Sequence, residues 1–356
     1  MNATVTVSVV IPARDSQDTI RVTIETLFHQ TKRPDEVIVV VCPGDFTRTA
    51  IEDYITTGFV RVLSVAVPED YVRDAQWKRW TGVKAAKGDI IFLTDSKVML
   101  EEYALENALK MMMEYGVDVI GGITPAWPDQ MENFWAKLHD KALVSNLPEF
   151  PPVGMLTAQN FGRTESLPVT SALMMRREVF EAVSSDFALK FSTVASTYDD
   201  YVLAWLIVEA GYPILVTNQV IAHHKHRISW KGYSAQISRS GQSAAIMAKM
   251  YPACPFGRRR VKQVAIISLA LFLSVMTSIF AVAAFGHTAI SAGLLLSVFA
   301  YSVFGTLNVI KAKEVKAFVF PVLTALLILN FSLHFAKTYI KTQHHPQDVA
   351  SYLQIH

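Results

Sequence analysis

Charged residues are absent from two long stretches near the carboxyl end of this 356-residue chain. Val264 to Ile310 contains no Asp, Glu, Lys or Arg, and Ala317 to Ala336 contains none either. A helix needs about 20 apolar residues to cross a bilayer. The first stretch is long enough for two crossings, with a break at Gly286, and the second is long enough for one. The sequence therefore predicts three transmembrane helices, at 263–285, 289–310 and 316–338.

Basic residues in short loops predict how these helices are oriented, because cytoplasmic loops carry an excess of Lys and Arg. Three arginines at 258–260 precede the first predicted helix, and three lysines lie between 311 and 316. The intervening loop holds only His287. We therefore expect a multi-pass protein of the cell (plasma) membrane, with residues 1–257 in the cytoplasm. Two cysteines provide no disulfide framework, which agrees with a cytosolic domain.

The first 257 residues alternate short β-branched runs with helical patterns. Continuous apolar runs end at a proline, a polar residue or an aspartate, and helical spacing lies between them. This order is typical of an α/β fold with a mostly parallel sheet and helices on both faces. Ligands bind such sheets beyond the carboxyl ends of the strands, so we expect a site there. The expected strands are 5–12, 35–42, 60–67 and 89–95, and the residues at or just past their ends include Asp15, Cys42, Pro43, Asp45 and Asp95.

Two acidic residues begin the predicted helix in YDDYVLAWLIVEAGY (198–212). Asp199 and Asp200 fall in its first turn, where the helix macrodipole favours negative charge. That effect alone explains many such pairs. The alternative interpretation makes one of the two carboxylates a general base at the edge of a cleft.

A histidine-rich segment, HHKHR (223–227), follows the next predicted strand. Imidazole is a common metal ligand, and arginine can neutralise a diphosphate. A solvated basic loop is the other interpretation. Residues 228–257 then mix basic and apolar side chains, which indicates an amphipathic helix on the membrane surface, with an ordinary surface helix as the alternative.

Four motifs in this order resemble glycosyltransferase family 2, whose members are inverting enzymes with a GT-A fold and nucleotide-sugar donors. VSVVIPARD (7–15) is similar to the family's opening strand and turn, and KRWTGVKAAKGDIIFLTD (78–95) resembles the segment that carries its arginine, its glycines and a metal-binding acid. YDDYVLAWLIVEAGY resembles the helix of the catalytic base. HHKHRISWKGY with QISRSG resembles the segment before the membrane. The resemblance covers about residues 5–250.

The resemblance implies that Asp200 is the catalytic base and that Asp199 orients the base or the acceptor. Cys42-Pro43 stands where the family often has two acids, so the base pocket departs from the family pattern. A UDP-linked donor is favoured, with a GDP-linked donor as the alternative. The residues that the resemblance assigns to the nucleotide sugar are Pro12, Ala13, Asp15, Asp45, Arg79, Asp95, Ser96, Lys97 and Arg227.

The family's metal motif usually has two acids, and only Asp95 remains of them here. Mg²⁺ can be held by one or two carboxylates together with substrate phosphates. We therefore favour a weak Mg²⁺ or Mn²⁺ site on Asp95, with His223 or His224 as an added ligand. The alternative is that basic side chains neutralise the diphosphate directly, namely Lys97, Arg79 and Arg227.

These observations predict an enzyme that moves one sugar from a nucleotide sugar to a lipid-linked acceptor at the cytoplasmic face, for cell-surface glycan synthesis. The acceptor would be a polyprenyl phosphate or a lipid-linked saccharide. One alternative is a processive polysaccharide synthase, although the Gln-x-x-Arg-Trp motif of such enzymes lacks its tryptophan here. Another is a degenerate, non-catalytic nucleotide-binding subunit. No basic stripe with interleaved aromatics indicates nucleic acid. The expected parts are a GT-A domain (1–227), a membrane-surface segment (228–257), a transmembrane region (258–340) and a tail (341–356).

Overall fold

The structure is a computed structural model that describes residues 5–67, 74–142, 151–162, 167–183 and 199–341. The predicted tail beyond residue 341 lies outside these residues. Contacts between residues divide the chain into two compact units. Among the described residues, the first unit lies within residues 5–130 and 151–226, and the second lies within residues 131–142 and 227–341.

The first unit is built on a parallel arrangement of the four strands expected from the sequence. β1 lies between β2 and β4, and β3 lies at the edge beyond β2. β1 and β2 are rich in buried β-branched residues, as strands covered on both faces require. These strands are β1 (Val7–Pro12), β2 (Glu36–Val41), β3 (Val60–Ser64) and β4 (Ile90–Leu93).

The rest of the sheet is mixed. β8 runs antiparallel between β4 and β6, and β9 pairs parallel with β6 but antiparallel with β5 and β7. The predicted α/β fold is thus confirmed, and the parallel order holds for its first four strands. The added strands are β5 (Val98–Leu100), β6 (Val119–Ile123), β7 (Gly154–Leu156), β8 (Leu173–Arg176) and β9 (Ile214–His224).

Helices cover both faces of the first strands. Alternate side chains of a strand point to opposite faces, so apolar residues in succession need cover on both sides. Val9 and Val39 share a buried core with helices α1 and α4. Val10 and Val40 face α3 instead, where a Cβ on Gly82 would lie 2.5 Å from Val10 Cγ1 and 3.0 Å from Val40 Cγ2. The elements of this unit besides the strands are α1 (Ile20–Phe28), η1 (Phe46–Ile51), α2 (Glu52–Thr56), α3 (Asp74–Ala85), α4 (Ala104–Tyr115), η2 (Pro128–Gln130), η3 (Thr170–Ala172) and α7 (Asp199–Glu209).

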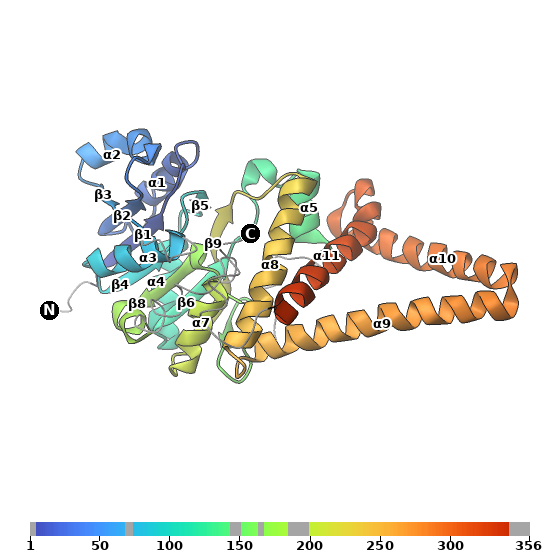
Figure 1. Cartoon of the computed structure of the whole chain (residues 1–356). Coiled ribbons are helices and arrows are strands. Elements are labelled where there is room, and N and C mark those ends of the chain that lie inside the picture. Colours follow the sequence, from blue (N-terminus) through green and yellow to red (C-terminus); the bar gives the residue numbers. More distant parts are fainter. Residues whose placement is uncertain (1–4, 68–73, 143–150, 163–166, 184–198, 342–356) are drawn as a thin grey trace. The chain divides into compact units, whose positions relative to one another are not determined.

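The second unit is helical and contains three helices that are long and apolar enough to cross a membrane. They confirm the three apolar helices predicted from the sequence. Figure 1 shows α9 and α10 as an antiparallel pair, and Gly286, with a φ of 55°, joins them. The helices of this unit are α5 (Phe134–Lys141), α8 (Trp230–Met250), α9 (Pro255–Phe285), α10 (His287–Ala312), η4 (Val315–Val319) and α11 (Phe320–Lys341).

Helix α8 packs along α11 within this unit (Figure 1). The two backbones approach closely at Gly241, where an added Cβ would lie 2.5 Å from the Phe331 carbonyl oxygen. Near this point Asn330 Oδ1 accepts a hydrogen bond from Ser238 Oγ at 3.0 Å, and Asn330 Nδ2 donates to the Ser234 carbonyl at 3.0 Å. The helix predicted at the membrane surface is therefore also the packing partner of an apolar helix.

The contact of Gly82 with β1 and β2 predicts that Gly82→Ala destabilises the first unit. The added methyl group would overlap Val10, and overpacking of a filled core costs about 1–3 kcal/mol. This cost outweighs the gain of about 1 kcal/mol that alanine brings to a helix interior. We expect a lower denaturation midpoint, measured by circular dichroism. The control is Lys84→Ala at an exposed position of the same helix, and a Gly82→Ala variant as stable as this control would contradict the packing.

Candidate active site

A buried arginine joins two carboxylates of the predicted site. Arg79 lies in α3, and its Nη2 donates to Asp95 Oδ1 at 2.8 Å while its Nη1 donates to Asp199 Oδ2 at 2.5 Å. Its side chain is 6% exposed. Burial alone would lower the pKa of Arg79, but Asp95 and Asp199 raise it above its ordinary value. These ion pairs hold the end of β4 against the start of α7.

Asp200 lies next to this ion-paired group in the first turn of α7. Its Oδ1 accepts a hydrogen bond of 2.5 Å from Thr170 Oγ1. Burial and the neighbouring Asp199 raise the pKa of Asp200 to about 7, although Arg79 and Thr170 act in the opposite direction. A carboxyl group with such a pKa exchanges its proton near neutral pH, as general acid–base catalysis requires. This environment favours the general-base interpretation of the pair, which stays a prediction.

The carboxylate of Asp95 is held from both sides just after β4. Its Oδ1 accepts from Arg79, and its Oδ2 accepts from Ser171 Oγ at 2.9 Å. Burial alone would raise the pKa of Asp95, but Arg79, His224 and Lys97 lower it to about 2. Asp95 is thus ionised at neutral pH, and the Nε2 atom of His224 lies 4.0 Å from its Oδ2.

The two predicted histidine ligands differ in their surroundings. Successive side chains of β9 point to opposite faces, and in the pairing with β5 His224 lies opposite Val98 while His223 lies opposite Met99. His223 Nδ1 lies 2.9 Å from the Ala126 carbonyl, and its Nε2 lies 2.7 Å from Glu101 Oε1. Both ring nitrogens of His223 are engaged there, so of these two histidines the structure brings His224 to Asp95.

The two residues after Asp95 are tied to other loops of the first unit. Ser96 Oγ lies 2.8 Å from Ser16 Oγ, which links the turn after β4 to the turn after β1. The Lys97 carbonyl accepts from Trp127 Nε1 at 3.0 Å. The charge of Lys97 helps to lower the pKa of Asp95, which places this lysine near the carboxylate.

The other residues predicted for the nucleotide lie where β1 and β2 end. Asp45 begins η1, and its carboxylate accepts from Thr47 N at 2.8 Å and from Asp15 N at 3.1 Å. Burial alone would raise the pKa of Asp45, but the Thr47 hydroxyl and these N–H groups lower it. Asp15 is exposed and has a φ of 47°, in the left-handed region. The Asp45 and Asp15 pair thus fixes the loops beside the strand ends.

A buried lysine braces the same strand ends. Pro12 is the last residue of β1, and the carbonyl of the following Ala13 accepts from Lys78 Nζ at 2.6 Å. Lys78 is 1% exposed and also donates to Asp74 Oδ2 at 2.8 Å. Cys42, which replaces an acid of the family pattern, has its Sγ 3.9 Å from the same Asp74 oxygen. A carboxylate from α3 therefore lies beside the position where β2 lacks one.

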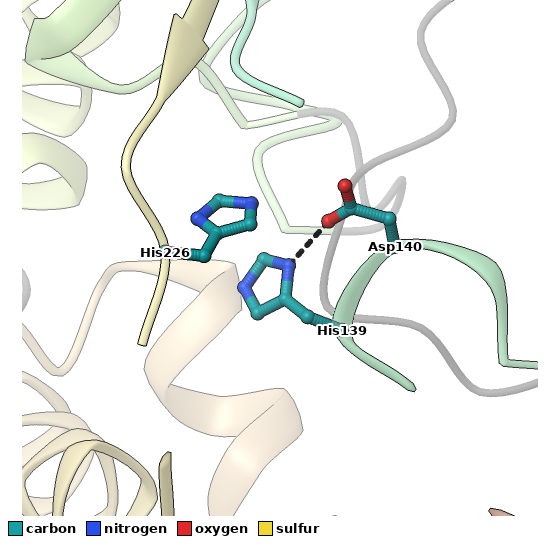
Figure 2. Close-up of side chains that lie close together, drawn as sticks. All are labelled: His139, Asp140 and His226. Carbon is teal, nitrogen blue, oxygen red and sulfur yellow. Dashed lines mark hydrogen bonds and ion pairs between the residues drawn. The ribbon is translucent and has the colours of Figure 1, made fainter. Parts of the chain in front are cut away.

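Two further groups involve the second unit. Arg227 belongs to it, and there its Nη1 donates to Gln236 Oε1 at 2.5 Å. Figure 2 shows that His139 and Asp140, also of the second unit, face each other, with His139 Nδ1 2.6 Å from Asp140 Oδ1. His226 is drawn in the same figure but belongs to the first unit, so we assign it no role with this pair.

Thr170 and Ser171 are site residues that the sequence analysis missed. They form η3 directly before β8, whose antiparallel register with β4 pairs Leu173 with Leu93. Continued by two residues, this register sets Ser171 opposite Asp95. The available signal was the polar pair in PVTSALMM (168–175), which precedes an apolar run. Nothing in that run shows that it returns beside β4.

Comparison with protein-family models identifies the chain. The model described as Glycosyl transferase family 2 matches residues 8–184. The chain belongs to glycosyltransferase family 2. The matched segment includes Arg79, Asp95 and the Thr170–Ser171 pair, and it ends before Asp199 and Asp200. No curated protein matches the chain.

A solved mannosyltransferase structure supports the GT-A fold of this glycosyltransferase. The mannosyltransferase PcManGT from Pyrobaculum calidifontis, in complex with GDP-Man and Mn²⁺, has a TM-score of 0.62 at 18% identity, and the match covers 95% of this chain and 88% of that one. S. aureus TarS has a TM-score of 0.45 at 17% identity over 67% of this chain and 65% of its own. Its complex with UDP-GlcNAc has a TM-score of 0.47 at 15% identity, with coverages of 68% and 66%. The predicted fold is confirmed.

The raised pKa of Asp200 predicts that Asp200→Asn stabilises the family 2 enzyme increasingly as pH rises. Unfolded aspartate titrates near pH 4 and folded Asp200 near pH 7, so native Asp200 binds more protons between these values and stability falls as pH rises through this window. The amide carries no such penalty. Its thermal midpoint should match wild type at pH 4 and exceed it at pH 8 by on the order of 5–10 °C.

The matched control is Glu209→Gln, an exposed acid on the same helix. It should follow the wild-type midpoint from pH 4 to pH 8. An Asp200→Asn midpoint that also parallels wild type over this range would show that Asp200 titrates like an ordinary aspartate.

Proposed function

We propose that this family 2 glycosyltransferase moves a single sugar from a nucleotide sugar to a lipid-linked acceptor, with inversion at the anomeric carbon. The acceptor would be a polyprenyl phosphate or a lipid-linked saccharide at the cytoplasmic face of the cell membrane. The observation that carries the proposal is Asp200, a partly buried carboxyl group with a pKa of about 7 beside the ionised Asp95.

Inversion needs one displacement, in which the acceptor hydroxyl attacks the anomeric carbon as the bond to the nucleoside diphosphate breaks. Asp200 is our catalytic base, and it takes the hydroxyl proton during this attack. Its pKa near 7 leaves a large ionised fraction at neutral pH and still gives the carboxylate enough basicity to hold the proton. The neighbouring Asp199 is committed to Arg79, which supports the division of roles between the two acids.

The leaving diphosphate gathers negative charge that needs to be neutralised. Both Nη atoms of Arg79 are engaged by Asp95 and Asp199, so we assign Arg79 to holding these carboxylates. Lys97 is the cation that we assign to the diphosphate, since its charge already reaches Asp95.

The donor set beside Lys97 also fits a weak site for a divalent ion. An ionised carboxylate and an imidazole face each other there, 4.0 Å apart, and oxygen and nitrogen ligands of this kind suit Mn²⁺ or Mg²⁺. Asp95 and His224 would hold the ion, with phosphate oxygens as further ligands. When bound, the ion would neutralise diphosphate charge. The similar mannosyltransferase structure contains Mn²⁺ and GDP-Man.

The apolar helices support an acceptor that resides in the membrane. A lipid-linked acceptor lies in the bilayer, and three helices of the described chain are long and apolar enough to enter it. Basic residues at 258–260 and 311–316 flank these helices at the ends that we propose to be cytoplasmic. The first unit would then work at the face where nucleotide sugars are made.

The proposed donor site predicts that one nucleoside diphosphate raises the thermal midpoint of the detergent-purified chain. A ligand at 100 times its Kd stabilises the folded state by about 2.7 kcal/mol. UDP, GDP, CDP and dTDP are compared, each with Mn²⁺ and with EDTA. The panel distinguishes the uridine donor that the sequence favours from the guanosine donor held by the mannosyltransferase structure. A shift lost in EDTA and in Asp95→Asn supports the metal site, whereas a shift retained in EDTA assigns the diphosphate to Lys97. No shift with any nucleotide would contradict the donor site.

The proposed transfer reaction predicts that radiolabelled sugar moves from the nucleotide sugar into lipid. Membranes that contain the wild-type chain, incubated with GDP-[¹⁴C]mannose, UDP-[¹⁴C]glucose or UDP-[¹⁴C]GlcNAc, should yield label that organic solvent extracts. Asp200→Asn should lower this rate by about 10²–10⁴-fold, since it removes the base. Glu209→Gln is the control and should transfer at the wild-type rate. Equal transfer by wild type and Asp200→Asn would contradict the assigned base, and nucleotide binding without any transfer would favour the non-catalytic subunit.

A further inference from the structure

Two neighbouring hydroxyl groups reach the two carboxylates on which the proposed function depends. Thr170 Oγ1 donates to Asp200 Oδ1 at 2.5 Å, and Ser171 Oγ donates to Asp95 Oδ2 at 2.9 Å. Asp200 lies in the first turn of helix α7 and Asp95 follows strand β4, so the two acids come from separate elements. One turn of chain therefore bridges the proposed base and the proposed donor-side carboxylate.

Arg79 joins the same group from the other side. It links Asp95 to Asp199, and Asp199 is bonded along the chain to Asp200. The contacts thus form a closed ring through Arg79, Asp95, Ser171, Thr170 and the Asp199–Asp200 pair. Asp95 is restrained at both of its oxygens, one by the guanidinium and one by Ser171. Displacing one member of such a ring displaces the members next to it.

The sheet fixes the hydroxyl pair in place. Thr94 Oγ1 donates to the Ser171 carbonyl at 2.9 Å, which extends the pairing of β4 with β8 toward the site. On the preceding side Pro168 packs against Gly121, where an added Cβ would lie 2.3 Å from Pro168 Cβ. The turn that carries the hydroxyl groups is therefore held by β4 on one side and by β6 on the other.

Burial separates these hydroxyl groups from substrate. Thr170 is 2% exposed and Ser171 is 6% exposed, so each acts through the carboxylate that it contacts. Thr170 engages Oδ1 of Asp200, so Oδ2 is the oxygen that we assign to the acceptor. The hydroxyl thereby decides which oxygen of the base meets the acceptor.

We propose that Thr170 and Ser171 are positioning residues that hold the Asp200 base and the Asp95 carboxylate in one geometry across the reacting centre. The proposal rests on the proposed function. Thr170 orients the acceptor side by presenting Asp200 Oδ2 to the attacking hydroxyl, and Ser171 orients the donor side through Asp95. The two variants should therefore differ in their kinetic effects. If each hydroxyl only made a structural hydrogen bond in the core, its removal would lower stability, and the two variants would not differ in kcat and donor KM.

The test uses the full chain in detergent with whichever nucleotide sugar supports transfer in the labelling assay. Thr170→Val should lower kcat by about 10–100-fold and leave the donor KM unchanged, since misplacement of a catalytic group costs about this much in rate. Thr170→Ser keeps a hydroxyl and should restore most of kcat. Ser171→Ala frees one oxygen of Asp95 and should raise the donor KM by roughly 10-fold.

Two control variants remove buried hydroxyl groups of the same kind away from the site. Thr217 Oγ1 donates to the Pro152 carbonyl at 2.6 Å, and Ser8 Oγ donates to Glu36 Oε2 at 2.8 Å. Thr217→Val and Ser8→Ala should leave kcat and KM near wild type. The inference is overturned if Thr170→Val and Ser171→Ala behave like these controls, or if Thr170→Ser fails to restore kcat, and transfer by the wild-type chain then still supports the proposed function.

A second measurement needs no donor. The Thr170 hydroxyl stabilises the ionised form of Asp200 and lowers its pKa, so its removal should raise this pKa further. The stabilising effect of Asp200→Asn, measured as a difference in thermal midpoint, should therefore still begin near the pKa of unfolded aspartate but reach its plateau at a higher pH in the Thr170→Val background. An unchanged pH profile overturns the positioning role even if the wild-type chain transfers no sugar, which would be the separate failure of the proposed function.

Discussion

The buried guanidinium of Arg79 is the interaction on which the site depends. A buried charge is tolerated only when it is paired, and Arg79 meets this condition by joining Asp95 and Asp199. One positive charge cannot neutralise a third carboxylate at short range. Burial, and after it the negative charge of Asp199, therefore raise the pKa of Asp200 to about 7, although Arg79 acts in the opposite direction. The same arginine thus keeps Asp95 ionised and leaves Asp200 able to exchange a proton.

Under the proposed function, this arrangement would let a single acid serve where the family usually has two. The oxygens of Asp95 are already engaged by Arg79 and Ser171, so its remaining lone pairs support only weak metal coordination. The nearby Lys97 and His224 both help to lower the pKa of Asp95. In the proposed site, the positive charge of Lys97 and an ion held by His224 would neutralise the diphosphate. In the proposed donor site, the phosphates would supply much of the metal affinity, and an ion and Lys97 would share the neutralisation.

Sequence patterns predicted the parts of this site that follow from strand ends and helix starts. Asp95 was placed by its strand, and Asp200 by a helix start and a family motif. Thr170 and Ser171 were missed because their role depends on the antiparallel return of β8 beside β4, and no local pattern encodes that pairing. His223 and His224 were treated alike, although strand alternation sends neighbouring side chains to opposite faces and only His224 reaches Asp95.

The helical unit shows the same limit of local patterns. The absence of charged residues predicted the three apolar helices, but it does not show which other helices pack against each of them. In the most apolar segments of α9 and α10 6% of the residues are buried, whereas 22% are buried in that of η4–α11, because α8 packs against α11. A polar amide is costly in lipid unless it is hydrogen-bonded, and Asn330 of α11 finds its partners in Ser234 and Ser238 of α8. The pairing of α8 with α11 therefore satisfies the amide of Asn330, and the exposed apolar surface of these helices lies chiefly on α9 and α10.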